Sequence, residues 1–157
     1  MRIGQGVDAH RLVEGRPLRL GGVVVAHERG LEGHSDGDVL LHAVASALLG
    51  ALGMGDLGRH FPSSDPNLEG VSSADIVARV MTLVRERGLR VGNVDSTIVA
   101  QEPRLAPYLV KMRSALADLL GVEAERVNVK VTSTDHLGFL GRGEGIAALA
   151  VALLEQP

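Results

Sequence analysis

The chain has 157 residues, of which 45% are hydrophobic, and a formal net charge of −3 with the histidines neutral. This length predicts one domain with its own core, spanning residues 1–157. The slightly acidic charge argues against nucleic-acid binding, and the lack of cysteine excludes disulfides and thiolate metal ligands. No signal peptide precedes Met1 and charges interrupt every apolar run, so we expect a soluble, cytoplasmic protein that does not enter the membrane.

The N-terminal third predicts strands followed by a helix. Residues 1–10 are typical of a strand, and residues 19–27 contain three valines after a Gly-Gly turn, which predicts a small β-hairpin. Residues 35–38, Ser-Asp-Gly-Asp, resemble a helix start of the capping-box kind. The apolar residues 39–52 then predict a helix that ends near two glycines.

The middle of the chain alternates between helix and strand. Residues 53–70 are rich in glycine and proline and predict a loop. Residues 72–88 predict a helix, because a serine cap, one apolar face and a terminal glycine follow in order. Residues 89–100 predict a strand that Pro103 terminates, and residues 105–121 carry leucines at helical spacing before a glycine.

The C-terminal part is less regular. Residues 127–131 alternate between apolar and polar and predict a strand, and residues 132–145 form a glycine-rich loop. Residues 146–154 fit a helix by their alanines or a doubly buried strand by their continuous apolar character. The alternation of elements predicts an α/β or α+β fold: a mixed sheet of about four strands, with three main helices on one face.

Three potential metal ligands come from two separate segments. Asp8 and His10 share a face of the first predicted strand, about 7 Å apart along the chain. His42 lies about one turn into the first predicted helix. Two imidazoles and a carboxylate suit zinc and leave a fourth position for a substrate. Spacing alone leaves a second interpretation open, in which Asp8 forms a turn and the histidines are ordinary polar residues.

Two segments have the composition of anion-binding loops. His34 and Ser35 precede a predicted helix start, where backbone amides and the helix dipole favour phosphate. Residues 132–135, Thr-Ser-Thr-Asp, follow a predicted strand and offer three hydroxyls and a carboxylate, which could hold phosphate oxygens and magnesium. Each segment also fits a helix cap or a turn, where these residue types commonly occur.

Three motifs, taken together, resemble one known family. They are Gly4-x-Gly6-x-Asp8-x-His10, His34-Ser35-Asp36-Gly37-Asp38-x-x-x-His42 and Leu137-Gly138-Phe139-x-Gly141-Arg142-Gly143-Glu144-Gly145, with Gly55-Asp56-Leu57-Gly58-x-x-Phe61-Pro62 and Asn93-Val94-Asp95 between them. Their order and spacing resemble the 2-C-methyl-D-erythritol 2,4-cyclodiphosphate synthases over essentially the whole chain.

The resemblance implies an enzyme of non-mevalonate isoprenoid biosynthesis. It would be a phosphorus-oxygen lyase that converts 4-diphosphocytidyl-2-C-methyl-D-erythritol 2-phosphate to the 2,4-cyclodiphosphate and CMP. The family is homotrimeric with active sites between subunits, and it implies that residues 146–154 form a strand. An isoprenoid diphosphate on the threefold axis, near Arg142 and Glu144, is a further implied partner.

The resemblance also implies residue roles. Zinc, or another divalent transition metal, would be held by Asp8, His10 and His42, and magnesium or manganese by Asp135. The implied catalytic residues are His34, Ser133 and Asp135. The implied substrate contacts are Asp8, His10, His34, Ser35, Asp56, Leu57, Gly58, Phe61, Ala100, Pro103, Arg104, Leu105, Ala106, Val131, Thr132, Ser133, Asp135, Phe139 and Arg142. The cytidine contacts at residues 100–106 and 131–133 would come from a neighbouring subunit.

Four positions depart from the family's pattern. Ser46 stands where an aspartate is common, and His136 replaces a frequent lysine. Asp135 stands where glutamate is common and is one methylene shorter, whereas Ser133 replaces threonine and keeps the hydroxyl. These changes bear on magnesium and phosphate geometry and leave the zinc ligands intact.

Two other functions are compatible with the same residues. A zinc phosphohydrolase would use the open metal position for water and release linear phosphates. A non-catalytic trimer that binds nucleotide or isoprenoid diphosphate would hold a structural metal with no open position.

Overall fold

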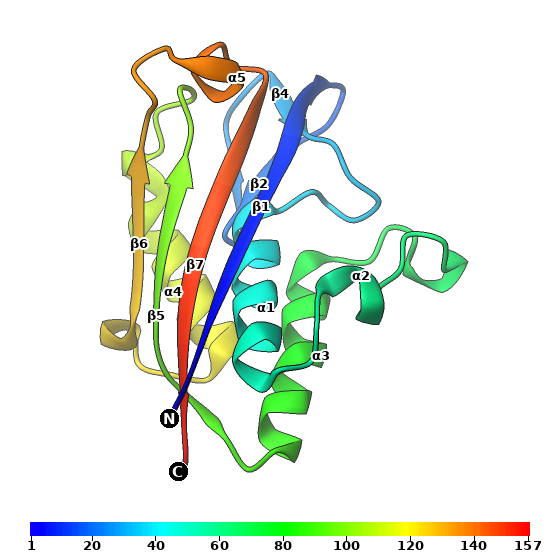
Figure 1. Cartoon of the computed structure of the whole chain (residues 1–157). Helices are drawn as coiled ribbons and strands as arrows, with labels where there is room; N and C mark the ends of the chain where they lie inside the picture. The colour runs from blue at the N-terminus through cyan, green and yellow to red at the C-terminus, as the bar shows by residue number, and fades with distance from the viewer.

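The computed structural model covers residues 1–157 and shows a five-stranded mixed sheet with helices packed on one side (Figure 1). The strand order is β4-β1-β7-β5-β6, and only β5 and β6 are parallel. The strands of this sheet are β1 (Arg2–Glu14), β4 (Arg29–Leu31), β5 (Arg90–Val99), β6 (Val127–Thr132) and β7 (Gly145–Glu155). A separate hairpin consists of β2 (Leu18–Leu20) and β3 (Val23–Val25).

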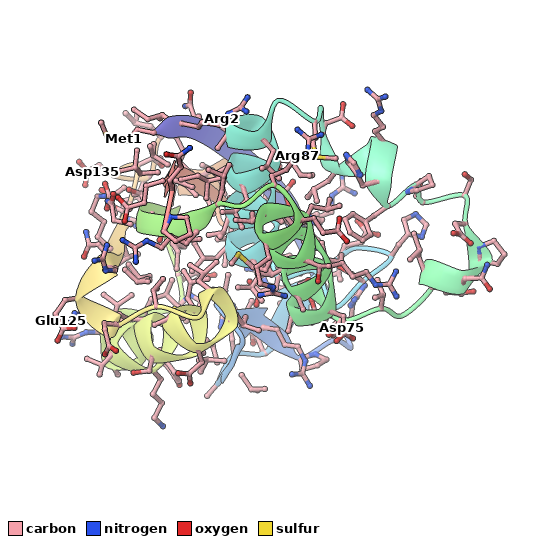
Figure 2. All side chains as sticks on the ribbon, turned by 90° about the horizontal axis from the view of Figure 1, so that it is seen from below. Met1, Arg2, Asp75, Arg87, Glu125 and Asp135 are labelled. Carbon is pink, nitrogen blue, oxygen red and sulfur yellow. The ribbon has the colours of Figure 1, made fainter.

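Three long helices lie on one side of the sheet, and Figure 2 shows α3 and α4 on the side opposite the start of β1. They are α1 (Val39–Leu52), α3 (Ser73–Glu86) and α4 (Leu109–Leu120). The short helical segments are α2 (Leu57–His60), α5 (Gly138–Gly141) and the 3₁₀ turns η1 (Pro66–Leu68), η2 (Ala106–Tyr108) and η3 (Ala124–Arg126). No helix has both the length and the apolar character needed to cross a bilayer.

The central helix α1 lies between the sheet and α3, which explains its composition. Every residue of α1 except Ser46 and Gly50 is buried, so the helix is apolar all round rather than amphipathic. Asp38 begins the helix: its carboxylate accepts a hydrogen bond from the backbone N–H of Leu41. Gly53 ends it in the left-handed conformation, which glycine adopts without steric cost.

Most predicted elements are confirmed, including α1 at residues 39–52, the hairpin and the strand β7. The sheet has five strands instead of about four, because β4 is a three-residue edge strand with little sequence signal. The predicted loop at residues 53–70 contains α2 and η1, and the loop at 132–145 contains α5. The start of α1 depends on Asp38 alone, because the Ser35 hydroxyl accepts a hydrogen bond from Gly37 N–H instead of capping the helix.

Candidate functional site

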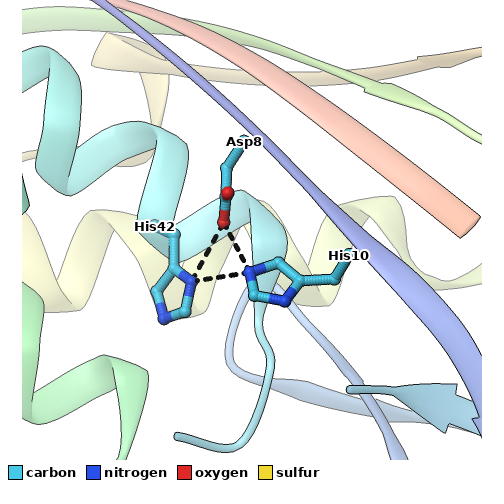
Figure 3. A group of neighbouring side chains, drawn as sticks. All are labelled: Asp8, His10 and His42. Atoms are coloured by element: carbon cyan, nitrogen blue, oxygen red, sulfur yellow. Dashed lines mark hydrogen bonds and ion pairs between the residues drawn. The ribbon is translucent and has the colours of Figure 1, made fainter. Parts of the chain in front are cut away.

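Three side chains meet where the middle of β1 passes the first turn of α1 (Figure 3). Asp8 Oδ2 lies 2.8 Å from His10 Nε2 and 3.0 Å from His42 Nδ1, and the two ring nitrogens are 3.2 Å apart. Asp8 and His10 are partly buried and His42 is buried. The structure therefore brings together the three residues that the sequence predicts as metal ligands.

The alternation of β1 explains how these residues come to lie against α1. Gly4, Gly6, Asp8 and His10 occupy alternate positions and so share the face toward the helix. A Cβ atom on Gly4 would lie 1.9 Å from the carbonyl oxygen of Ala47, and one on Gly6 would be equally close to that of Ala43. The two glycines let the helix backbone rest directly on the strand, and this close approach carries His42 to the two ligands of β1.

His10 is oriented by a backbone carbonyl on the other side of its ring. Its Nδ1 makes a hydrogen bond with the carbonyl oxygen of Glu32. In the neutral ring, this bond places the proton on Nδ1 and leaves the lone pair on Nε2, which faces Asp8 and His42. A lone pair in this position is what a metal ion requires.

The ion pair between Asp8 and His10 perturbs both pKa values. Burial alone raises the pKa of Asp8, but hydrogen bonds from His10 and His42 and the attraction of the rings lower it to about 2. The hydrogen bond to Asp8 raises the pKa of His10, and burial opposes that increase only in part. Asp8 is therefore ionised at all physiological pH values, and metal binding would displace the proton that His10 shares with it.

The donor set fits a tetrahedral divalent ion. All three ligand atoms lie within 4.8 Å of one another. Zinc bonds of about 2.0–2.2 Å place neighbouring tetrahedral ligands about 3.3 Å apart, so the observed separations would need to grow by only a few tenths of an ångström. Three protein ligands leave one position for a substrate or water, which is the pattern of catalytic zinc sites.

The candidate metal centre opens into a cleft of about 540 Å³. One wall is the His34–Ser35 segment and the other is the chain from Leu57 to Ile76. The cleft is lined by Asp8, His10, His34, Ser35, His42, Leu57, Phe61, Pro62, Ser63, Ser64, Asp65, Pro66, Leu68, Glu69, Val71 and Ile76. Among the predicted contacts, Asp56 and Gly58 do not line it, since Asp56 caps α2 by accepting a hydrogen bond from Arg59 N–H.

A second group of predicted residues lies at the carboxyl ends of the parallel strands β5 and β6. Ala100 N–H donates to the carbonyl of Thr132, and His136 N–H donates to the side chain of Gln101. These bonds place the start of the 100–106 segment beside residues 132–136. Asp135 in the second segment has a φ of 50°. Asp135 lies across the molecule from Asp75 at the start of α3 (Figure 2). Within one chain this second group does not line the metal-containing cleft.

The remaining predicted residues lie near α5. Phe139 is half exposed and lines a second cavity of about 520 Å³ together with His10, Arg29 and Glu144. Arg142 makes a two-pronged ion pair with Glu144, with its Nη2 2.8 Å from the carboxylate, and both side chains are exposed. In the single chain these opposite charges therefore satisfy each other.

Two residues at the site, Arg16 and Ser73, have no role predicted from the sequence. Arg16 donates to the carbonyl oxygens of Gly33 and Ser35, and so fixes the backbone on both sides of His34. Ser73 contacts His42 from the start of α3. No local pattern marks Arg16 or Ser73, because both act across long sequence separations.

Comparison with known proteins identifies the family of this fold and site. The family model described as the YgbB family matches residues 1–155. The chain belongs to the YgbB family. A protein from Geobacillus kaustophilus named 2-C-methyl-D-erythritol 2,4-cyclodiphosphate synthase is 59% identical over 155 residues, which cover 99% of this chain and 98% of the relative.

Solved structures agree with this YgbB assignment. The bifunctional IspDF from Campylobacter jejuni matches with a TM-score of 0.95 and 40% identity, and the match covers 99% of this chain and 42% of that longer one. A structure described as 2C-methyl-D-erythritol-2,4-cyclodiphosphate synthase in its CDP-bound form matches with a TM-score of 0.91 and 35% identity. That match covers 98% of this chain and 100% of the other.

Proposed function

We propose that the protein converts 4-diphosphocytidyl-2-C-methyl-D-erythritol 2-phosphate to 2-C-methyl-D-erythritol 2,4-cyclodiphosphate with release of CMP, as a lyase of isoprenoid biosynthesis. The observation that carries this proposal is the open Asp8-His10-His42 centre in a chain 59% identical, over its full length, to a protein named as that synthase. The CDP-bound relative supports the choice of a cytidine nucleotide substrate.

The cleft residues and Asp135 would each bind a different part of the substrate or its metal ions. Asp8, His10 and His42 would hold zinc or another divalent transition metal, and Asp135 would hold magnesium or manganese. Bound metals supply Lewis acidity and charge neutralisation to the phosphates. His34 and Ser35 lie beside the candidate metal centre and would orient the phosphate end, while Leu57 and Phe61 supply apolar surface for the methylerythritol carbons.

The cytidine half of the site would come from a neighbouring subunit. Residues 100–106 and 131–135 lie outside the cleft of their own chain, so a complete site requires a second copy. The sheet face away from the helices exposes Ile3, Val7, Leu149 and Val151, and this apolar surface supports assembly. A homotrimer closes such a heterologous contact in a ring. Phe139, Arg142 and Glu144 would then lie toward the axis, where an isoprenoid diphosphate could bind.

The chemistry is an intramolecular displacement at phosphorus. An oxygen of the 2-phosphate attacks the β-phosphorus, the bond from that phosphorus to the α-phosphate oxygen breaks, and CMP leaves with the bonding electrons. The second pKa of the 2-phosphate is about 6, so the nucleophile is already ionised and needs no dedicated base. The role of the protein is to bring two anions together in line, with His34 and Ser133 beside the reacting phosphates.

Phosphorus NMR of the purified protein with substrate and magnesium tests this proposal directly. We expect the signals of a cyclic diphosphate and of CMP, with turnover lost after zinc chelation and restored by added zinc. His42→Ala should lose bound zinc and nearly all turnover, because two ligands from one strand do not complete the centre.

Other outcomes would identify the alternatives. Linear phosphate products would assign a hydrolase, and bound CDP without turnover, in a metal-loaded protein, would assign a binding protein. Full activity of zinc-free His42→Ala would remove the candidate metal centre from the reaction. Full activity of a monomer in sedimentation would contradict the shared site, and native mass spectrometry without added mass from farnesyl diphosphate would reject the axial ligand.

A further inference from the structure

The ring of His42 is held from the side that faces away from the candidate metal centre. Its Nε2 lies 3.0 Å from the hydroxyl oxygen of Ser73 and 3.1 Å from that of Ser35. Ser73 is completely buried at the first position of α3. His42 thus lies between β1, which faces its Nδ1, and the start of α3, which is distant from His42 in sequence.

The hydroxyl of Ser73 has a second partner that determines the direction of its own proton. It makes a short hydrogen bond to Asp36 Oδ1, and the backbone N–H of Ser73 donates to Asp36 Oδ2 at 3.2 Å. A carboxylate only accepts hydrogen bonds, so the Ser73 hydroxyl donates its single proton to Asp36. The oxygen of Ser73 is then available to His42 only as an acceptor.

When Nδ1 of His42 binds a metal ion in place of its hydrogen bond to Asp8, one proton arrangement of the ring suits the contact with Ser73. Nε2 must carry the proton that Ser73 accepts, and in the neutral ring Nδ1 then has the lone pair. Nδ1 is the atom that faces Asp8 and His10. The opposite tautomer would place two lone pairs against each other at the buried contact between Nε2 and Ser73, which is unfavourable in a site of low polarity.

We propose that Ser73, supported by Asp36, is a positioning residue that fixes His42 in the tautomer and ring orientation required for metal binding. This inference rests on the metal-dependent function proposed above. Side chains that orient a metal-ligating histidine in this way commonly contribute about 10–100-fold to metal affinity. Ser73 also lies between the cleft-lining residues Val71 and Ile76, so its hydrogen bonds connect one wall of the cleft to the candidate metal centre.

Ser73→Ala removes the hydroxyl and nothing else, and Ser72→Ala is its matched control. The Ser72 hydroxyl caps α3 by accepting a hydrogen bond from Asp75 N–H, and Ser72 makes no hydrogen bond to His42. Both variants should destabilise the start of α3, but only Ser73→Ala should affect the candidate metal centre. Ser73→Thr keeps the hydroxyl and should restore most of what Ser73→Ala loses.

Two measurements independent of turnover decide the matter. Zinc affinity, measured by chelator competition, should fall about 10–100-fold in Ser73→Ala and stay unchanged in Ser72→Ala. Proton NMR of the zinc-loaded protein should show the His42 Nε2 proton shifted downfield by its hydrogen bond in the wild type and Ser72→Ala, and shifted upfield in Ser73→Ala. If Ser73 had a merely structural role, Ser73→Ala would change neither the zinc affinity nor the NMR signal of His42.

The outcomes separate this inference from the proposed reaction. Unchanged zinc affinity and an unchanged signal of the His42 Nε2 proton in Ser73→Ala would overturn the role of Ser73, even if the enzyme turns over as proposed. A wild type that binds zinc and shows the Ser73 effect but forms no cyclic product would retain the positioning role and reject the cyclase. A wild type that binds no zinc would overturn both.

Discussion

The contact between β1 and α1 makes the candidate metal centre sensitive to a single methyl group at Gly6. A Cβ atom there would lie 1.9 Å from the carbonyl oxygen of Ala43 and 2.7 Å from the amide nitrogen of Ala47. Carbon and oxygen do not approach closer than about 3 Å, so in Gly6→Ala the helix must retreat by about 1 Å. Metal sites tolerate changes of only about 0.2 Å in ligand distance, so we expect a loss of zinc affinity of at least about tenfold.

The same substitution should lower stability, because overpacking against backbone atoms cannot be relieved by a rotamer change. We expect the free energy of unfolding of the zinc-free protein to fall by about 1–3 kcal/mol in urea titrations. Zinc content by mass spectrometry and chelator competition give the metal affinity.

Gly50 supplies a matched control on the same helix. A Cβ on Gly50 would be 3.5 Å from its nearest neighbour, the carbonyl oxygen of Gln5, which is an ordinary contact. Gly50→Ala should therefore keep wild-type zinc affinity and gain about 0.5–1 kcal/mol from helix propensity. A Gly6→Ala protein with wild-type stability and zinc affinity would show that the close approach of β1 and α1 does not position His42.

Three further predictions concern other parts of the molecule. Asp38 is buried and accepts hydrogen bonds from the N–H groups of Gly21, Gly22 and Leu41. Asp38→Ala should therefore lower the free energy of unfolding in urea by about 3 kcal/mol, and Asp38→Asn by an intermediate amount. A loss below about 1 kcal/mol in Asp38→Ala would contradict this role. Asp135→Ala should raise the magnesium concentration needed for turnover while leaving zinc in place, and an unchanged magnesium titration would remove Asp135 from the mechanism. Because folding lowers the pKa of Asp8 from 3.8 to about 2, its ionised form stabilises the fold above the unfolded pKa, and that stabilisation is lost as pH falls toward 2. Between pH 5 and pH 3 the zinc-free wild type should therefore lose about 1 kcal/mol more than Asp8→Asn in urea unfolding, and equal losses would refute the assignment.

The sequence predicts a helix or strand well where the buried positions are apolar and the boundaries carry capping residues. Residues 39–52 are apolar throughout and are followed by Gly53, so the helix and its end are both marked. Residues 146–154 are ambiguous for a physical reason. From Ala148 to Val151 of β7 buried and exposed positions alternate, but the exposed ones are Leu149 and Val151, so hydropathy does not follow the alternation. Only the family resemblance identifies this segment as a strand.

In the candidate site, residues that are close in sequence are predictable from their spacing, whereas contacts between distant segments are not. Asp8 and His10 are two residues apart on a strand, and His42 is near a predicted helix start, so spacing makes a shared centre plausible. Ser73 reaches His42 across 31 residues, and no periodicity encodes that contact. β4 is missed for a similar reason: its central Gly30 has low strand propensity and is required because a Cβ would lie 2.4 Å from the carbonyl oxygen of Pro17.

The pairing of β1 with β7 sets an order of events during synthesis of the protein. Asp8 and His10 lie opposite Ala148 and Ile146, so the strand that carries these two candidate ligands is synthesised well before its long neighbour in the sheet. Until β7 has left the ribosome, β1 lacks this long partner, and the backbone that aims Asp8 and His10 is not held in place. Metal loading at the proposed centre is thus expected only in chains whose translation has passed β7.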